Sequence, residues 1–204
     1  MTGGGPTEGG VMSLVELIAQ ADERGLATSG LACLDRCVPL SGGDDDMLRP
    51  LWASLAEGGD QWRRDWGERV EQARAGFDAT GLPEGDASAE GEAAVLAHRM
   101  LLAAPAECTA DTLRTWADAC SVAALQIHRL LDASDDGASS MTAHREGGTQ
   151  DIPPLVAAEL RRQIAILELL SAHGPTGLRQ ALDLSTEGRR VLRAVVSRRA
   201  RGRV

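Results

Sequence analysis

The sequence predicts an all-α protein, an irregular helical bundle of seven to nine amphipathic helices. Apolar residues recur every three or four positions along most of the chain, which is the spacing of one face of an α-helix. No segment alternates polar and apolar residues with β-branched side chains, as a half-buried strand would. With 204 residues, 43% of them hydrophobic, the chain is long enough to bury a core of its own.

The predicted helices of the main bundle lie within residues 11–132, after a glycine-rich tail, 1–10, that we expect to be disordered. A helix over 11–25 is expected to end at Gly25, and a second over 26–37 follows at once, which predicts an antiparallel hairpin. Further helices are predicted over 50–58, 61–77, 92–104 and 110–132.

The C-terminal part, 151–204, is separated from the bundle by residues 133–150. That segment is small, polar and rich in glycine, so we expect a flexible linker or a long loop. Pro153 and Pro154 then open a helix that extends to Gly174, with an expected core face of Val156, Leu160, Ile164, Leu167 and Leu170. Helices over 176–184 and 185–202 follow. We expect these helices to pack back on the bundle, because the apolar face needs a partner.

Charge is distributed unevenly along the chain. All 21 basic residues are arginine, a usage typical of GC-rich genomes such as those of actinobacteria. From Ser185 onward the sequence has seven arginines and one acidic residue, Glu187, which gives this part a net charge of +6. Because the whole chain has a net charge of −9, residues 1–184 carry a net charge of −15. An acidic body repels nucleic acid and a basic tail attracts it. The candidate residues for binding nucleic acid or other anions are Arg189, Arg190, Arg193, Arg198 and Arg199.

Cysteine and histidine raise the question of a metal site. Cys33 and Cys37 are four positions apart and share a helix face, and Cys120 and His128 could complete a set of four ligands. The spacing is not the CxxC of common zinc sites, and a free cysteine usually behaves as a small buried apolar group. We therefore predict no metal and no cofactor, with a helical metalloprotein built on these four residues as a third possibility.

Two tryptophans one turn apart, Trp62 and Trp66, allow two interpretations. They are either core residues or, with Arg63 and Arg69 beside them, an aromatic surface that contacts a partner. No phosphate-binding loop, GxGxxG after a strand, GxSxG or HExxH motif is present, so we predict no catalytic residues and lean against an enzyme.

The function that these observations favour is a small regulatory or scaffold protein that acts through protein–protein contacts. Its partner would be another protein or a second copy, as in a homodimer. Association with nucleic acid through the arginine-rich tail is the alternative. No apolar run approaches the length needed to span a bilayer, and residues 1–10 lack the features of an export signal. We therefore expect a cytoplasmic protein without membrane contact.

Overall fold

The computed structural model describes residues 12–40, 46–78, 88–133 and 140–202, and it confirms the all-α class. The regular structure in those ranges is helical, without a strand. The helices are α1 (Leu14–Gln20), α2 (Glu23–Cys37), α3 (Arg49–Ala56), α4 (Gln61–Asp78), α5 (Ala89–Leu102), α6 (Ala110–Leu131), α7 (Met141–Arg145), α8 (Pro154–His173) and α9 (Leu178–Arg201), with short 3-10 segments at η1 (Val38–Leu40) and η2 (Gly174–Gly177). None of the described helices is long and apolar enough to cross a membrane.

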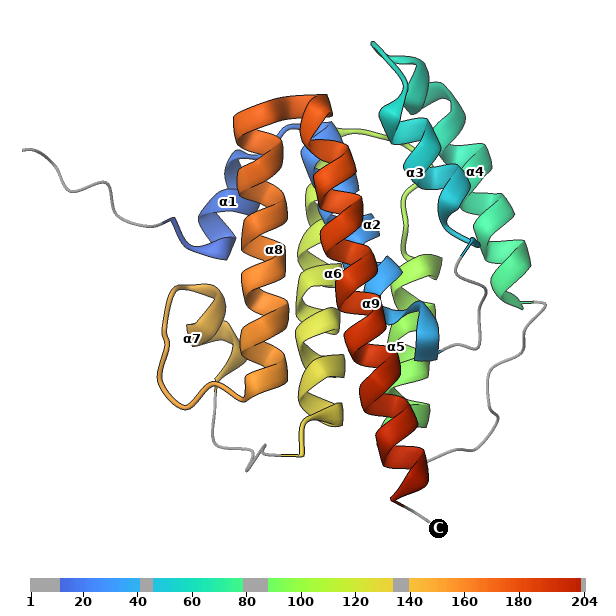
Figure 1. Ribbon diagram of the computed structural model, residues 1–204. Coiled ribbons are helices and arrows are strands. Elements are labelled where there is room, and N and C mark those ends of the chain that lie inside the picture. The colour runs from blue at the N-terminus through green and yellow to red at the C-terminus, as the bar shows by residue number, and fades with distance from the viewer. Residues whose placement is uncertain (1–11, 41–45, 79–87, 134–139, 203–204) are drawn as a thin grey trace, which may run out of the picture.

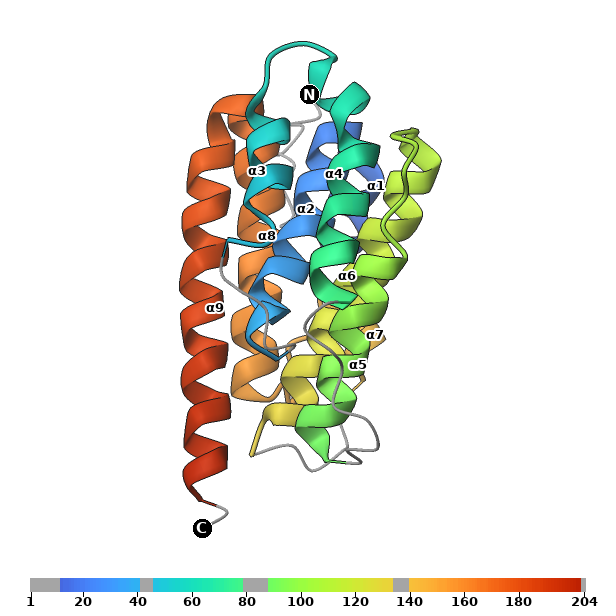
Figure 2. The ribbon, with the colours of Figure 1, turned by 90° about the vertical axis from the view of Figure 1, so that its right-hand side faces the viewer.

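Helix α2 is the centre of the bundle. All its residues from Gly25 to Cys37 are buried, and α6, α9, α8 and α5 pack around it. Figures 1 and 2 show α8 and α9 side by side along one side of α2, with α5 and α6 on another side. Two charged residues, Asp35 and Arg36, lie inside this enclosed helix. Because a buried charge must be paired, the helices that cover α2 must supply a carboxylate for Arg36 and a cation for Asp35.

The first helical boundary differs from the prediction. The helix expected to run to Gly25 ends at Gln20, and α2 already begins at Glu23. The reason is a cap: Asp22 Oδ1 accepts a hydrogen bond from the Gly25 backbone N–H at 2.7 Å, so Asp22 begins a helix that Gly25 continues. The two helices are therefore joined by the short link Ala21–Asp22.

The end of the chain also differs from the prediction. Instead of two helices over 176–184 and 185–202, α9 is one continuous helix from Leu178 to Arg201. Ser185, which resembles an N-cap in the sequence, points into the core, where its Oγ donates to Asp35 Oδ2 at 2.8 Å. A side chain used for a tertiary contact does not cap a new helix, so α9 passes through this position without a break.

The tryptophans Trp62 and Trp66 lie in the core, with exposures of 1% and 0%. Their rings meet edge to face at 6.2 Å, and Trp66 meets Trp116 of α6 in the same way at 5.9 Å. The interpretation that places these indoles on a partner-facing surface is therefore wrong, because Trp66 packs on Trp116 in the core and Trp62 packs on Trp66. Of the two arginines in that predicted interface, Arg63 packs over Trp62 at 5.1 Å, and Arg69 is half-buried and donates to Gln72 at 3.2 Å.

The segment 133–150, for which the sequence predicts a linker or long loop, contains the short helix α7. Residues 134–139 of that segment, like the predicted N-terminal tail 1–10, lie outside the described residues. Arg145 at the end of α7 contacts α6 by donating from Nε to Ser121 Oγ at 3.2 Å. His144 of α7 is buried, with its Nδ1 at 3.0 Å from the Gly148 carbonyl oxygen.

Candidate functional site

A buried ion pair joins α2 to α8. Arg36 donates from Nε to Glu159 Oε2 at 2.8 Å and from Nη2 to Glu159 Oε1 at 2.5 Å, and both side chains are 0% exposed. This two-pronged contact matches the planar guanidinium to the planar carboxylate, which is the strongest arrangement available to such a pair. We name the pair, its hydrogen-bonded neighbours Gln163 and Ser121, and the adjacent His128 the polar core.

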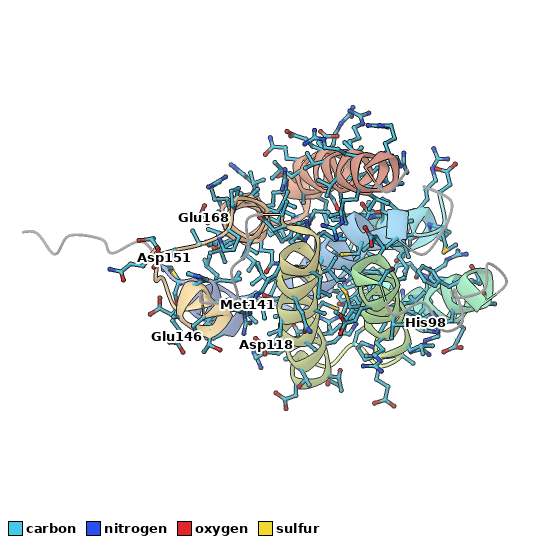
Figure 3. All side chains as sticks on the ribbon, turned by 90° about the horizontal axis from the view of Figure 1, so that it is seen from below. His98, Asp118, Met141, Glu146, Asp151 and Glu168 are labelled. Atoms are coloured by element: carbon cyan, nitrogen blue, oxygen red, sulfur yellow. The ribbon has the colours of Figure 1, made fainter. Side chains whose placement is uncertain are left out.

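Hydrogen bonds extend the polar core toward the surface. Gln163 Nε2 donates to Glu159 Oε1 at 2.9 Å, and Ser121 Oγ donates to Gln163 Oε1 at 2.7 Å. Arg145 donates to Ser121 and forms an ion pair with Asp118, which Figure 3 shows on the α7 side of α6. The chain of contacts therefore links the centre of the bundle to α7.

His128 of α6 is part of the polar core. Its Nδ1 donates to the Ala124 carbonyl oxygen at 2.7 Å, and its Nε2 lies 3.6 Å from Glu159 Oε2. Burial lowers the pKa of His128, against the opposing effect of the Glu159 carboxylate. Burial also acts to raise the pKa of Glu159, but the Arg36 guanidinium and its hydrogen bonds outweigh it and hold that pKa below its usual range. At neutral pH the core therefore contains a charged Arg36–Glu159 pair beside a neutral imidazole.

The three buried cysteines, Cys33, Cys37 and Cys120, are protonated thiols. Cys33 Sγ accepts a hydrogen bond from Arg36 Nη2 at 3.4 Å. Burial raises the pKa of Cys33 to about 12 and those of Cys37 and Cys120 well above the ordinary range. Metal binding and nucleophilic attack both need the thiolate, so these groups fill the core as small apolar side chains.

The predicted ligand set of Cys33, Cys37, Cys120 and His128 is not assembled into a metal site. In the described ranges, no group of three or more His, Cys, Asp or Glu side chains is arranged to hold an ion. His128 instead directs its two nitrogens at a backbone carbonyl oxygen and at Glu159. The physical reason is that the Arg36 guanidinium already neutralises Glu159 and contacts Cys33, which leaves no negative centre for a cation.

A second buried ion pair joins α2 to α9 and corrects the prediction for the arginine tail. Arg189 Nη1 lies 3.3 Å from Asp35 Oδ1, and Ser185 Oγ donates to the other carboxylate oxygen. Arg199 Nε donates to Glu90 Oε1 at 2.7 Å. Arg189 and Arg199 therefore anchor α9 to this chain, whereas Arg190, Arg193 and Arg198 are exposed on it.

An open apolar groove lies between α5 and α6. It is formed by two adjoining hollows of about 420 Å³ and 180 Å³ that share Ala103, Trp116 and Ala119. Trp116 forms part of the wall, with its Nε1 donating to the Met100 carbonyl oxygen at 2.9 Å. At one end the groove is lined by Arg99, and at the other by Asp111. We call it the α5/α6 groove.

Sequence reasoning missed the polar core and this groove. A signal for the first was available: Glu159 and Gln163 are four positions apart and lie on the same helix face as Val156 and Ile166. A carboxylate on an apolar face indicates a buried partner cation. The groove had no local signal, because it depends on how α5 packs against α6.

Comparisons with protein-family models, with curated proteins and with solved structures found no match to this chain.

Proposed function

We propose that this chain is a non-enzymatic, cytoplasmic helical protein that acts through protein–protein contacts, in a regulatory or scaffold role. The polar core supports a structural purpose for the buried ionisable groups, because Arg36 and Glu159 are joined by two hydrogen bonds away from solvent, with His128 beside them. The surface that supports the contact role is the α5/α6 groove, which is the observation that carries this proposal.

The shape and lining of the α5/α6 groove suit a helix. The side chains that α6 contributes to it extend from Asp111 to Ala123, a rise of about 18 Å at 1.5 Å per residue, or roughly three helical turns. Ala103 and Ala119 are small and exposed, so a second backbone can approach closely. Between them, Trp116 borders the groove, with 3% of its surface exposed there.

The occupant that the charges favour is a second copy of this chain. Arg99 lines one end of the groove and Asp111 lines the other, with the shared Trp116 and Ala119 between them. In a two-fold symmetric dimer, each residue of one copy meets its complement on the other. A two-fold axis through the middle of the groove would bring Arg99 of each copy toward Asp111 of its partner. The same surface is thus complementary to itself in charge.

A charge-swap series tests the dimer by sedimentation velocity over a range of concentrations. Arg99→Glu and Asp111→Arg are each expected to weaken association, and the double variant is expected to restore it. Ala119→Glu, which fills the groove with a charge, should give a monomer, whereas the control Ala75→Glu, at an exposed position of α4, should not. A monomeric wild-type protein, or a series in which the double variant fails to recover, would contradict the proposal.

A further inference from the structure

The outer side of α9 carries a row of exposed arginines over its last three turns. Arg190, Arg193, Arg198 and Arg201 are all exposed, and at 100° per residue they occupy an arc of about 140°. From first to last they rise about 16 Å along the helix. Residues 190–201 of the helix contain no acidic side chain, and the exposed Glu187 lies one turn before Arg190 on the same side. We call these four residues the arginine face.

Two arginines on the inner side of α9 pair with carboxylates of other helices. Asp35 pairs with Arg189 and Glu90 pairs with Arg199, and these contacts hold α9 in one orientation. Figure 3 shows nitrogen-tipped side chains fanning away from the outer side of α9, and Figure 2 shows the end of α9 reaching past the neighbouring helices. The face is therefore presented on a rigid helix rather than on a mobile tail.

We propose that the arginine face binds the phosphate backbone of double-stranded nucleic acid, without reading its sequence. Between the arginines the same arc holds only Ala194 and Ser197, so it lacks the apolar or aromatic anchor around which protein interfaces are built. It equally lacks an aromatic residue on which a base could stack. What remains is a row of guanidinium groups, each able to bind phosphate oxygens in a two-pronged contact.

The acidic remainder of the chain does not prevent this contact at physiological salt. Electrostatic repulsion is screened over about 8 Å at 0.15 M ionic strength. The body of α9, about 10 Å across, separates its outer side from the helices behind it. A duplex presents one phosphate charge per roughly 1.7 Å of axis, so about 16 Å of α9 faces several phosphates at once.

Binding to a 20-base-pair DNA duplex of mixed sequence, followed by fluorescence anisotropy between 50 and 200 mM NaCl, tests the proposal. Four phosphate contacts predict a slope of log affinity against log salt near −3.6, an affinity loss of about 150-fold over this range. Replacing all four arginines of the face with glutamine should abolish binding. The matched control carries the same charge change at four other arginines, Arg49, Arg64, Arg114 and Arg179, and should retain it.

Three results would overturn the assignment: no binding by the wild-type protein at 50 mM salt, equal loss in the control, or binding of polyglutamate as tightly as DNA. The last result would identify an acidic protein as the partner of the face. Circular dichroism of each variant establishes that it is folded. The test is independent of the α5/α6 groove, because Ala119→Glu removes the proposed dimer contact and leaves the arginine face intact.

Discussion

Removing the guanidinium of Arg36 should destabilise the protein far more than removing a surface arginine. Arg36→Met leaves the Glu159 carboxylate enclosed without the two hydrogen bonds, at 2.8 and 2.5 Å, that neutralise it. Hydrogen bonds to charged groups contribute about 1.5–3 kcal/mol each, and breaking a buried ion pair costs about 3–5 kcal/mol. We therefore expect a loss of about 3–5 kcal/mol from an unfolding free energy on the order of 5–15 kcal/mol.

Urea unfolding followed by circular dichroism measures this loss, and two further variants isolate its cause. In the double variant Arg36→Met with Glu159→Leu both charges are gone, so most of the lost stability should return. The matched control is Arg114→Met, which breaks an exposed pair with Asp111 at 3.4 Å and should cost under about 1 kcal/mol. An Arg36→Met variant that is no less stable than Arg114→Met would refute the reasoning, as would a double variant that is less stable than Arg36→Met alone.

The remaining predictions concern packing and pH. Gly188→Ala should lower the unfolding free energy, although alanine favours a helix, because its new Cβ would overlap Arg36 Cδ. The control Gly76→Ala, whose Cβ would meet only Met47 Cγ at 3.9 Å, should raise the unfolding free energy by about 0.5–1 kcal/mol in the same urea assay. Burial raises the folded pKa of Cys33 from 9.0 to about 12, so the stability from its protonated thiol is complete below pH 9 and is lost as pH rises toward 12. A Cys33→Ala variant should show a shallower decline of the urea midpoint between pH 8 and 10.5; an unchanged decline would count against this cause. Against the effect of burial, Arg36 holds the folded pKa of Glu159 below 4.5. The ionised Glu159 therefore stabilises the fold above pH 4.5, and this stabilisation is lost as pH falls through the folded pKa. In acid unfolding, the Glu159→Gln variant should lack this pH-dependent loss of stability.

The α4 helix shows how much of the fold was predictable. Its apolar residues Trp62, Trp66, Val70 and Phe77 recur at helical spacing, and all four are buried. Periodicity predicts such a helix because each residue's direction depends only on its position along the same helix. The C-terminal helices were harder to predict, since the sequence around Ser185 satisfies local rules for a helix start and only the contact with Asp35 overrides them.

The α8 helix shows where the pattern gave the wrong core face. Its sequence suggests a core face that includes Leu160 and Ile164, yet both are only half-buried, and Glu159 and Gln163 occupy the interior beside Val156. An apolar residue is favoured inside by its own chemistry, so periodicity assigns it there. A carboxylate is buried only when another element supplies a cation, and here the cation is Arg36 of α2.

The sequence by itself determined the all-α class, the approximate position of most helices and the opposite charges of the body and the tail. These properties follow from local spacing and composition, which need no knowledge of distant neighbours. The tertiary structure alone decided which charges are internal and which are offered to a partner: Arg36 and Arg189 are paired in the interior, while Arg190, the residue after Arg189, is exposed. The guanidinium group is the same in each case. What separates them is whether folding places a carboxylate within hydrogen-bonding distance and removes the water around it, and both conditions depend on helices far apart in the sequence.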